Sequence, residues 1–235
     1  MTAAIATRTT EVTWTRRLAG VVVAAATALV ILGAVVLALL SPPYIHAALA
    51  QAGSADYLAA GGLPVDASGA ASLSDLTVQE LFLGPGTFAF SAPGTPERFY
   101  DVAEASHLRD ARTVLYGFLL AVAASAVALV AAFAAGRREA WTWRAASRGA
   151  GVLAIVLGVI GLFATVAFDQ AFTLFHEVFF PGGNWSFDPR TERLVQLYPI
   201  PFWELTATVL VASAVTLGAL VWWLARRQAR RVDAA

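Results

Sequence analysis

Two of the three histidines in this sequence stand at helical spacing from carboxylates, a pattern that could support acid–base chemistry. Glu104, His107 and Asp110 follow one another at intervals of three, so their side chains share one face of a helix. His176 comes seven residues after Asp169, which places both on one face if that segment is helical. A carboxylate beside an imidazole can orient the ring for proton transfer. His107 and His176 are therefore candidate catalytic residues.

Other kinds of site fit the pattern less well. Two histidines and several carboxylates could bind a metal ion, but no HExxH or similar ligand spacing is present, so we expect neither metal nor cofactor. The sequence has no cysteine and no G-x-S-x-G motif, which argues against a protein nucleophile. His46 is interpreted as a polar residue at a membrane surface. A histidine-based transfer without a covalent enzyme intermediate is the sharpest hypothesis left.

The composition indicates where such residues would be held. Of 235 residues, 58% are hydrophobic and only 14% are charged, whereas soluble domains average about one quarter charged. The formal net charge is zero, so there is no overall positive charge to indicate nucleic-acid binding. The chain is expected to be an all-α membrane protein.

Four apolar segments are each long enough to cross about 30 Å of hydrocarbon as a helix. They predict four transmembrane helices, with a helical extracytoplasmic subdomain between the first and the second. The predicted parts are an inner N-terminus (1–17), the first span (18–41), the outer subdomain (42–112), the second span (113–135), an inner loop (136–148), the third span (149–168), an outer loop (169–204), the fourth span (205–225) and an inner C-terminus (226–235).

The arginines predict the orientation of these spans, because cytoplasmic loops of membrane proteins are enriched in basic residues. Eleven of the sixteen fall at one side, including Arg8 near the N-terminus, and five fall in the two loops at the other. Tryptophans such as Trp14 flank the spans, as in an aromatic belt. We expect both termini to be cytoplasmic, in the plasma membrane of a bacterial cell.

Shorter signals predict local structure. Ser74 is expected to cap a helix over residues 75–83. Thr95, followed by Pro96, is expected to begin a second helix that continues into the span at 113–135. Gly158 and Gly161 are expected to let helix backbones approach closely.

Two blocks of sequence resemble a known family. The first is SHLRD at residues 106–110; the second is FHEVFF at 175–180, followed by NWSFDP at 184–189 and LVQLYP at 194–199. They resemble the four-helix bacterial integral membrane proteins that include the lipoprotein intramolecular transacylases. The resemblance implies a four-span bundle with an outward-facing helical subdomain.

The resemblance also implies an activity. One acyl chain moves from the diacylglyceryl group of a lipoprotein to the α-amine of that lipoprotein's N-terminal cysteine, and the family's paired histidines correspond to His107 and His176. Asp110 or Glu104 would orient His107, and Asp169 would orient His176. Asn184 would polarise the ester carbonyl, with Trp185 as a neighbouring supporting residue. The expected partners are diacylglyceryl lipoproteins or membrane lipids.

A second hypothesis is a non-catalytic membrane protein that binds a lipid or a protein partner through its aromatic outer loop. Transport is a weaker interpretation, because no Asp, Glu, His or Arg lies near the centre of a predicted span.

Overall fold

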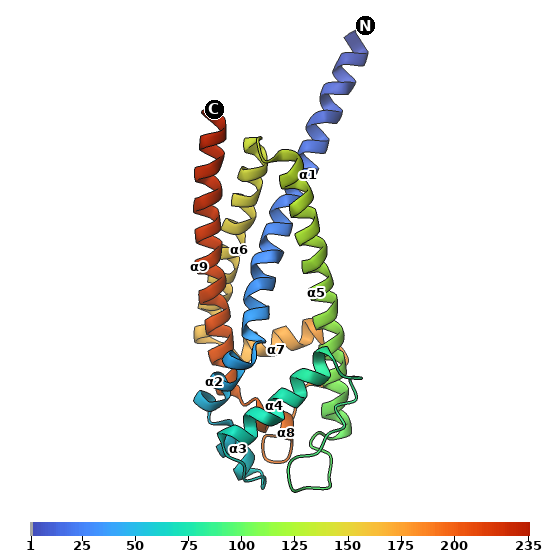
Figure 1. The fold of residues 1–235 in the computed structure, drawn as a ribbon, viewed down its shortest axis with the longest axis vertical. Coiled ribbons are helices and arrows are strands. Elements are labelled where there is room, and N and C mark those ends of the chain that lie inside the picture. The colour runs from blue at the N-terminus through green and yellow to red at the C-terminus, as the bar shows by residue number, and fades with distance from the viewer. Residues whose placement is uncertain (1) are drawn as a thin grey trace. The chain divides into compact units, whose positions relative to one another are not determined.

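A computed structural model of the chain describes the backbone of residues 2–235 and the side chains of residues 15–235. The side chains of Arg8 and Trp14, which entered the orientation prediction, lie outside the described residues. Within the described part, the chain forms nine α-helices and one isolated β-bridge, between Ser91 and Arg98 (Figure 1). The predicted all-α fold class is confirmed. In chain order the helices are α1 (Thr2–Leu39), α2 (Pro42–Ala52), α3 (Ser54–Ala60), α4 (Ala67–Phe82), α5 (Val102–Gly136), α6 (Ala140–Val166), α7 (Phe168–Phe179), α8 (Arg193–Leu197) and α9 (Ile200–Asp233).

Four of these helices are long and apolar enough to cross a membrane. They are Thr15–Leu39 of α1, and α5, α6 and α9 in full. Two of these helices end two residues earlier than predicted; the predicted spans end at residues 41 and 168. The first ends at Leu39 because Pro42 and Pro43 begin α2, and the third ends at Val166 because Ala167 has non-helical φ and ψ of −147° and 53°.

The chain divides into two compact units. Unit 1 contains Met1–Val35, Leu119–Val159 and Val211–Ala235, and unit 2 contains Val36–Phe118 and Ile160–Leu210. Each unit therefore takes segments that are far apart in the sequence.

Unit 1 packs through small residues. A Cβ atom built on Gly149 of α6 would lie 1.9 Å from the backbone oxygen of Ala24 in α1, so only glycine permits this approach. A Cβ on Gly218 of α9 would lie 3.0 Å from the oxygen of Ala150. Gly158, by contrast, has no atom within 4 Å of such a Cβ. The prediction of close packing at Gly158 was wrong, because that glycine does not lie on the face that meets another helix.

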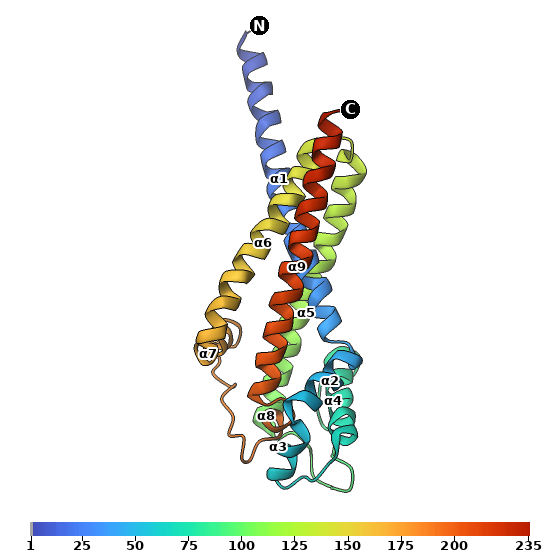
Figure 2. The same ribbon diagram turned by 90° about the vertical axis from the view of Figure 1, so that its left-hand side faces the viewer.

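Polar contacts join three segments of unit 1 near one end. Arg16 donates to Glu139 at 3.1 Å, and Arg144 forms an ion pair with Asp233. Three segments thus lie together: the part of α1 near Arg16, the connection between α5 and α6, and the end of α9 (Figure 1, Figure 2). These are the segments that carry the larger group of arginines.

Unit 2 contains the short helices α2, α3, α4, α7 and α8. Its helix α4 starts earlier than predicted, at Ala67, because the Asp66 carboxylate accepts a hydrogen bond from the Gly69 backbone amide at 2.8 Å. Ser74, expected as a cap, lies inside the helix and is fully buried. Its hydroxyl hydrogen-bonds to the Tyr198 hydroxyl at 2.8 Å.

Helix α5 starts later than predicted, at Val102. Asp101 and Glu104 form a capping box: the Glu104 amide donates to the Asp101 carboxylate at 2.7 Å, and the Asp101 amide donates to the Glu104 carboxylate at 2.8 Å. The start predicted at Thr95 was wrong, because residues before Asp101 form turns and the bridge between Ser91 and Arg98. As predicted, α5 then continues without a break into the apolar segment.

The core of unit 2 consists largely of aromatic and leucine side chains. Phe88, Leu73 and Leu197 have no exposed surface, and Tyr100 is 1% exposed. The buried Tyr100 hydroxyl hydrogen-bonds to Thr77 at 2.8 Å, so this polar group is satisfied within the core.

Candidate active site

His107 and His176 lie beside each other in unit 2. His107 is on α5 and His176 is on α7, and their ring centroids are 6.0 Å apart with an interplanar angle of 28°. They are only 9% and 8% exposed. The fold therefore brings together, in a buried position, the two histidines that the sequence pattern selected as candidate catalytic residues.

The lengths of the helices place both rings outside the apolar spans. At 35 residues, α5 measures about 52 Å, whereas the hydrocarbon core of a bilayer is about 30 Å thick. The uncharged part of α5 starts after Arg112, so His107 precedes it by more than one helical turn. His176 is on α7, which follows the break at Ala167 and is separate from the four long apolar helices.

The hydrogen bond of His176 fixes which of its ring nitrogens carries the proton. The Nδ1 atom lies 2.7 Å from the backbone oxygen of Phe172. Because a carbonyl oxygen can only accept, Nδ1 must donate, and Nε2 of the neutral ring keeps its lone pair. His176 thus presents an unprotonated nitrogen that can accept a proton.

His107 has a different environment. Its Nδ1 atom is buried and has no hydrogen-bond partner among the described residues. Near the ring, the Asn184 side-chain amide donates to the Asp110 carboxylate at 2.6 Å. The structure therefore brings Asp110 and Asn184 together beside His107, as the sequence pattern suggested for Asp110.

Aromatic side chains surround the histidine pair. Phe180 contacts both rings, with centroids 4.7 Å from His107 and 5.5 Å from His176. Trp185 lies 5.0 Å from His176, and Phe187 lies 5.7 Å from His107. These rings exclude water from the imidazoles, which strengthens electrostatic interactions there.

Burial lowers the pKa of both histidines. The pKa of His107 falls from 6.5 to about 4, chiefly because burial disfavours the charged ring and secondly because His176 is nearby. The charge of Asp110 and the side chain of Asn184 act in the opposite direction. The pKa of His176 is also lowered by burial, and its hydrogen bond to Phe172 opposes the shift. Both rings are therefore neutral at pH 7.

Two predicted supporting residues lie in other environments. Glu104 is 1% exposed, and its second oxygen accepts a hydrogen bond from the Leu194 amide at 2.6 Å. Together with its capping bond to Asp101, this contact joins the start of α5 to α8. Burial raises the pKa of the Glu104 carboxyl. Asp169 is exposed on α7, and among the described contacts it makes none with His176, whose Nδ1 is bonded to Phe172 instead.

The sequence reasoning missed Phe172 and Phe187. The Phe172 ring lies 4.1 Å from the His176 ring, centroid to centroid, and its carbonyl accepts the Nδ1 proton. Its position four residues before His176 on the same helix was the available signal. Phe187 carried no such signal, because it reaches His107 from a loop.

Metal coordination was the main alternative use of such a pair. Among the described residues, no group of three or more His, Asp or Glu side chains is placed to hold a metal ion. The arrangement instead offers two neutral imidazoles, one with a fixed tautomer, in an aromatic enclosure. That arrangement suits proton transfer.

The fold and the site define a helical membrane protein with a buried histidine pair. The sequence model described as "Lipoprotein intramolecular transacylase Lit" matches residues 85–203 of this chain, which include both histidines and their aromatic neighbours. The chain belongs to the lipoprotein intramolecular transacylase family.

Solved structures agree with this family assignment at the level of the fold. The membrane-integral lipoprotein intramolecular transacylase Lit from Bacillus cereus is 16% identical, with a TM-score of 0.74 over 94% of this chain and 99% of that one. A form of the same protein with a histidine-to-arginine mutation gives a TM-score of 0.70 at 15% identity, over 95% of this chain and 96% of that one. A form with a histidine-to-alanine mutation gives 0.67 at 15% identity, over 97% and 100%. No curated protein matches the sequence.

Proposed function

We propose that this protein catalyses intramolecular acyl transfer within bacterial lipoproteins. The acyl chain would leave the diacylglyceryl group and join the α-amine of the N-terminal cysteine. The observation that carries the proposal is the buried, neutral pair of His107 and His176. Their ring centroids are 6.0 Å apart, and both lie inside the segment that matches the family.

The reaction needs one proton to be taken and one to be returned. The amine nitrogen attacks the ester carbonyl carbon, an amide bond forms, and the carbon–oxygen bond to glycerol breaks. The proton lost by the amine balances the proton gained by the glycerol oxygen, which leaves as a hydroxyl. An α-amine has a pKa near 8, so a neutral imidazole can accept its proton during the attack, and the imidazolium can then protonate the glycerol oxygen.

The site suggests distinct roles for the two rings. His176 accepts the amine proton through Nε2, because Nδ1 is held by the Phe172 carbonyl. His107 lies beside His176 and is the candidate to protonate the glycerol oxygen, because the negative charge of Asp110 favours the charged form of its ring. Asn184 is held by Asp110 near the pair and is the candidate to polarise the ester carbonyl.

The remaining supporting residues help to position the histidines and the acyl chain. Trp185 and Phe180 pack against His176 and form an apolar boundary for the acyl chain. Glu104 positions His107 by fixing the start of α5 on α8. Asp169 is exposed, so any role it has is exerted at the surface of α7 rather than on His176.

The orientation proposed for the protein puts this site at the outer face of the bacterial plasma membrane. The end of unit 1 that carries Arg16, Arg144 and the α9 arginines would face the cytoplasm, since basic residues are retained on that side. A reporter fused at Ala235 should therefore be cytoplasmic, and an extracytoplasmic reporter would contradict the orientation.

The proposal is tested in a host that otherwise makes only diacylated lipoproteins. Mass spectrometry of N-terminal lipopeptides should detect the N-acylated lyso product when the wild-type protein is present. His107→Ala and His176→Ala should each reduce its formation by on the order of a hundredfold or more, the usual contribution of a general acid–base group. Full activity in either variant would contradict a role in proton transfer.

His46→Ala is the matched control. His46 lies in the same unit and pairs with Asp75 at 2.8 Å on the protein surface, so its loss should leave product formation close to wild type. Equal loss in all three variants would point to a general effect on folding.

A lipid-binding protein without catalysis remains the second candidate, because α7 exposes an apolar surface that includes Leu174 and Val178, 56% and 64% exposed. That function predicts that His107→Gln and His176→Gln are silent, because binding requires no proton transfer. Trp185→Ala and Phe180→Ala would instead impair binding. Transacylation predicts that the glutamine variants are as inactive as the alanine variants, because an amide cannot accept the proton.

A further inference from the structure

The C-terminal part of α9 carries two rows of identical residue order. Each row has one tryptophan followed by two arginines at intervals of four, so its three side chains lie along one line of the helix surface. The first row is Trp222, Arg226 and Arg230, and the second is Trp223, Arg227 and Arg231. We call these six residues the α9 Trp–Arg rows.

In each row the first arginine lies against its tryptophan. The Arg226 guanidinium carbon is 4.9 Å from the Trp222 ring centroid, and that of Arg227 is 5.6 Å from the Trp223 ring centroid. A guanidinium at this distance is attracted by the face of the indole ring. The stacking holds two of the four charges at defined positions next to aromatic side chains.

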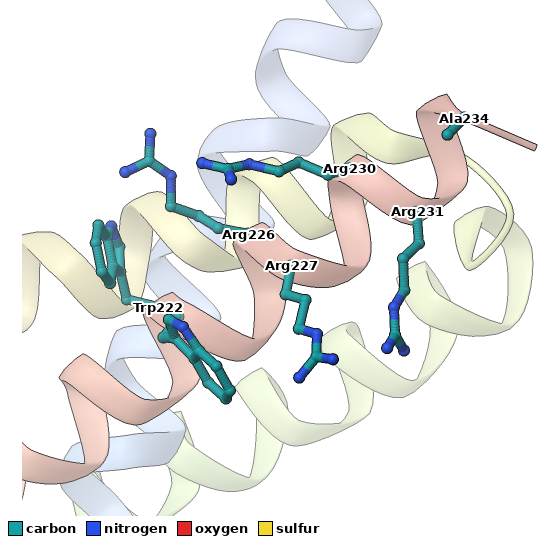
Figure 3. A pocket seen from close by; sticks show the side chains of 7 residues that line it. Trp222, Arg226, Arg227, Arg230, Arg231 and Ala234 are labelled. Atoms are coloured by element: carbon teal, nitrogen blue, oxygen red, sulfur yellow. The ribbon is translucent and has the colours of Figure 1, made fainter.

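The rows point away from the core of unit 1. Ala225 and Ala229, which lie between them in the sequence, are 4% and 3% exposed and form the packed face of the helix. The arginines are exposed, with Arg226 and Arg230 on one side of α9 and Arg227 and Arg231 on the other (Figure 3). The rows and Ala234 line an open hollow of about 550 Å³.

The four charges of the rows lack acidic partners within the described part of the chain. The nearest acidic residue in the sequence, Asp233, is in an ion pair with Arg144, and Glu139 is bonded to Arg16. Arg16 and Arg144 of unit 1 are thus paired with carboxylates, whereas the structure shows no carboxylate partner for the four arginines of the rows within the described residues. Two of those four, Arg226 and Arg227, contact indole rings. A ligand with negative charge would supply the missing partner.

We propose that the α9 Trp–Arg rows bind the phosphate of an anionic phospholipid. Guanidinium groups match phosphate oxygens through paired hydrogen bonds. Tryptophan side chains settle at the level of lipid headgroups, with the ring in the apolar region and the N–H near water. The order Trp, Arg, Arg along an apolar helix therefore places the guanidinium groups where the phosphates of one leaflet lie. Neutral, zwitterionic phospholipid lacks the net charge that four unpaired arginines select.

The test uses the full-length protein in nanodiscs that contain phosphatidylcholine with a minor share of phosphatidylglycerol. Native mass spectrometry should show that wild-type protein retains phosphatidylglycerol in preference to phosphatidylcholine. Arg226→Gln with Arg230→Gln should weaken this retention by on the order of tenfold, as expected for two basic residues at an anionic lipid. Trp222→Leu should weaken it by less, because the charge remains.

The matched control is Arg137→Gln with Arg138→Gln. These two arginines are exposed in the same unit and change the net charge by the same amount, but among the described side chains no indole ring is stacked on them. Retention close to wild type in this control supports a site at the rows. Equal loss in both double variants, or equal retention of the two lipids by wild-type protein, would overturn the proposal and leave only a general effect of positive charge.

Discussion

The cores of the two units are built from different residues. In unit 1, the buried cluster contains Val23, Ala145, Ala146 and Ala225, and Gly149 lets two backbones meet. In unit 2, the buried cluster contains phenylalanine, tyrosine and leucine side chains, with polar groups bonded inside it. The spans of unit 1 show an apolar outer surface, with Leu120 and Val130 more than 70% exposed.

This difference reflects what surrounds each core. Lipid tails are as apolar as leucine, so helices in a membrane gain little by burying large side chains and associate through close backbone packing. Away from the lipid, burying large apolar side chains is the main favourable term. A chain can therefore hold a precise polar site in the second kind of core, where side chains fix the positions of His107 and His176.

Loss of the buried carboxylate of unit 2 has the largest expected effect on stability. Glu104→Ala removes the capping bond to Asp101 and leaves the buried Leu194 amide without its acceptor. We expect a loss of about 3 kcal/mol in the free energy of unfolding, measured by denaturation in detergent micelles. The exposed Glu97→Ala is the control and should change little. Equal effects would show that the contact with Leu194 does not stabilise the unit.

In unit 1 the substitution expected to be most destabilising is at a glycine in a helix contact. Gly149→Ala forces a Cβ atom against the Ala24 backbone, so the two helices must separate. We expect thermal unfolding to show a loss of about 2 kcal/mol, typical of overpacking. Gly158→Ala adds the same methyl group where no atom lies within 4 Å, and it should be neutral or slightly stabilising. A harmless Gly149→Ala would contradict the close-packing description of unit 1.

Acid should affect unit 2 before unit 1, because all three histidines lie in unit 2. The folded-state pKa of His107 is about 4, below the ordinary 6.5, so only the unfolded state takes up the proton between these values. Stability from this group is therefore complete above pH 6.5 and falls as the pH drops toward 4, by about 1 to 2 kcal/mol after allowing for solvent screening.

Hydrogen exchange of unit 2 amides between pH 6.5 and 4 measures this loss. His107→Gln cannot titrate, so its pH dependence should be shallower than that of wild-type protein. Identical pH dependence in the two proteins would show that burial of His107 does not control acid stability.

The smallest expected effect distinguishes two buried serines of unit 2. The Ser74 hydroxyl is bonded to Tyr198, whereas Ser54 Oγ has no hydrogen-bond partner among the described residues. Ser74→Ala should cost about 1 kcal/mol, since it leaves the Tyr198 hydroxyl without this partner. Ser54→Ala should be neutral or stabilising by a few tenths of a kcal/mol, because it removes an unsatisfied polar group. Chemical denaturation of the two variants side by side measures the difference, and equal losses would contradict it.

Much of the fold was predictable, because a long apolar segment has one stable form in a membrane. The helices that cross the apolar region and the break at Pro42 followed from local composition. The capping residues Asp66 and Asp101, which precede α4 and α5, were missed for a different reason. Several residues nearby can cap a helix, and the choice depends on which start lets Ser74 and Glu104 reach Tyr198 and Leu194.

The candidate site divides in the same way. Residue type and spacing alone selected His107 and His176, and the position of Asp110 near His107 follows from helical periodicity. Spacing also suggested Asp169 for His176, but the ring turned to the Phe172 carbonyl instead. An imidazole can bond to any acceptor in reach, so its partner depends on the rotation of the side chain and the packing around it.

The sequence by itself therefore determined the class of the protein, its four apolar helices and its two candidate histidines, because these depend on composition and short-range periodicity. Only the tertiary structure decided that the histidines meet in one aromatic enclosure, that His176 keeps Nε2 unprotonated, and that Glu104 stabilises a helix junction. The second of these outcomes depends on the rotation of the His176 side chain toward the Phe172 carbonyl, four residues earlier on α7, and the other two depend on contacts between segments tens of residues apart. Such contacts follow from the packing of the whole unit, which no local pattern encodes.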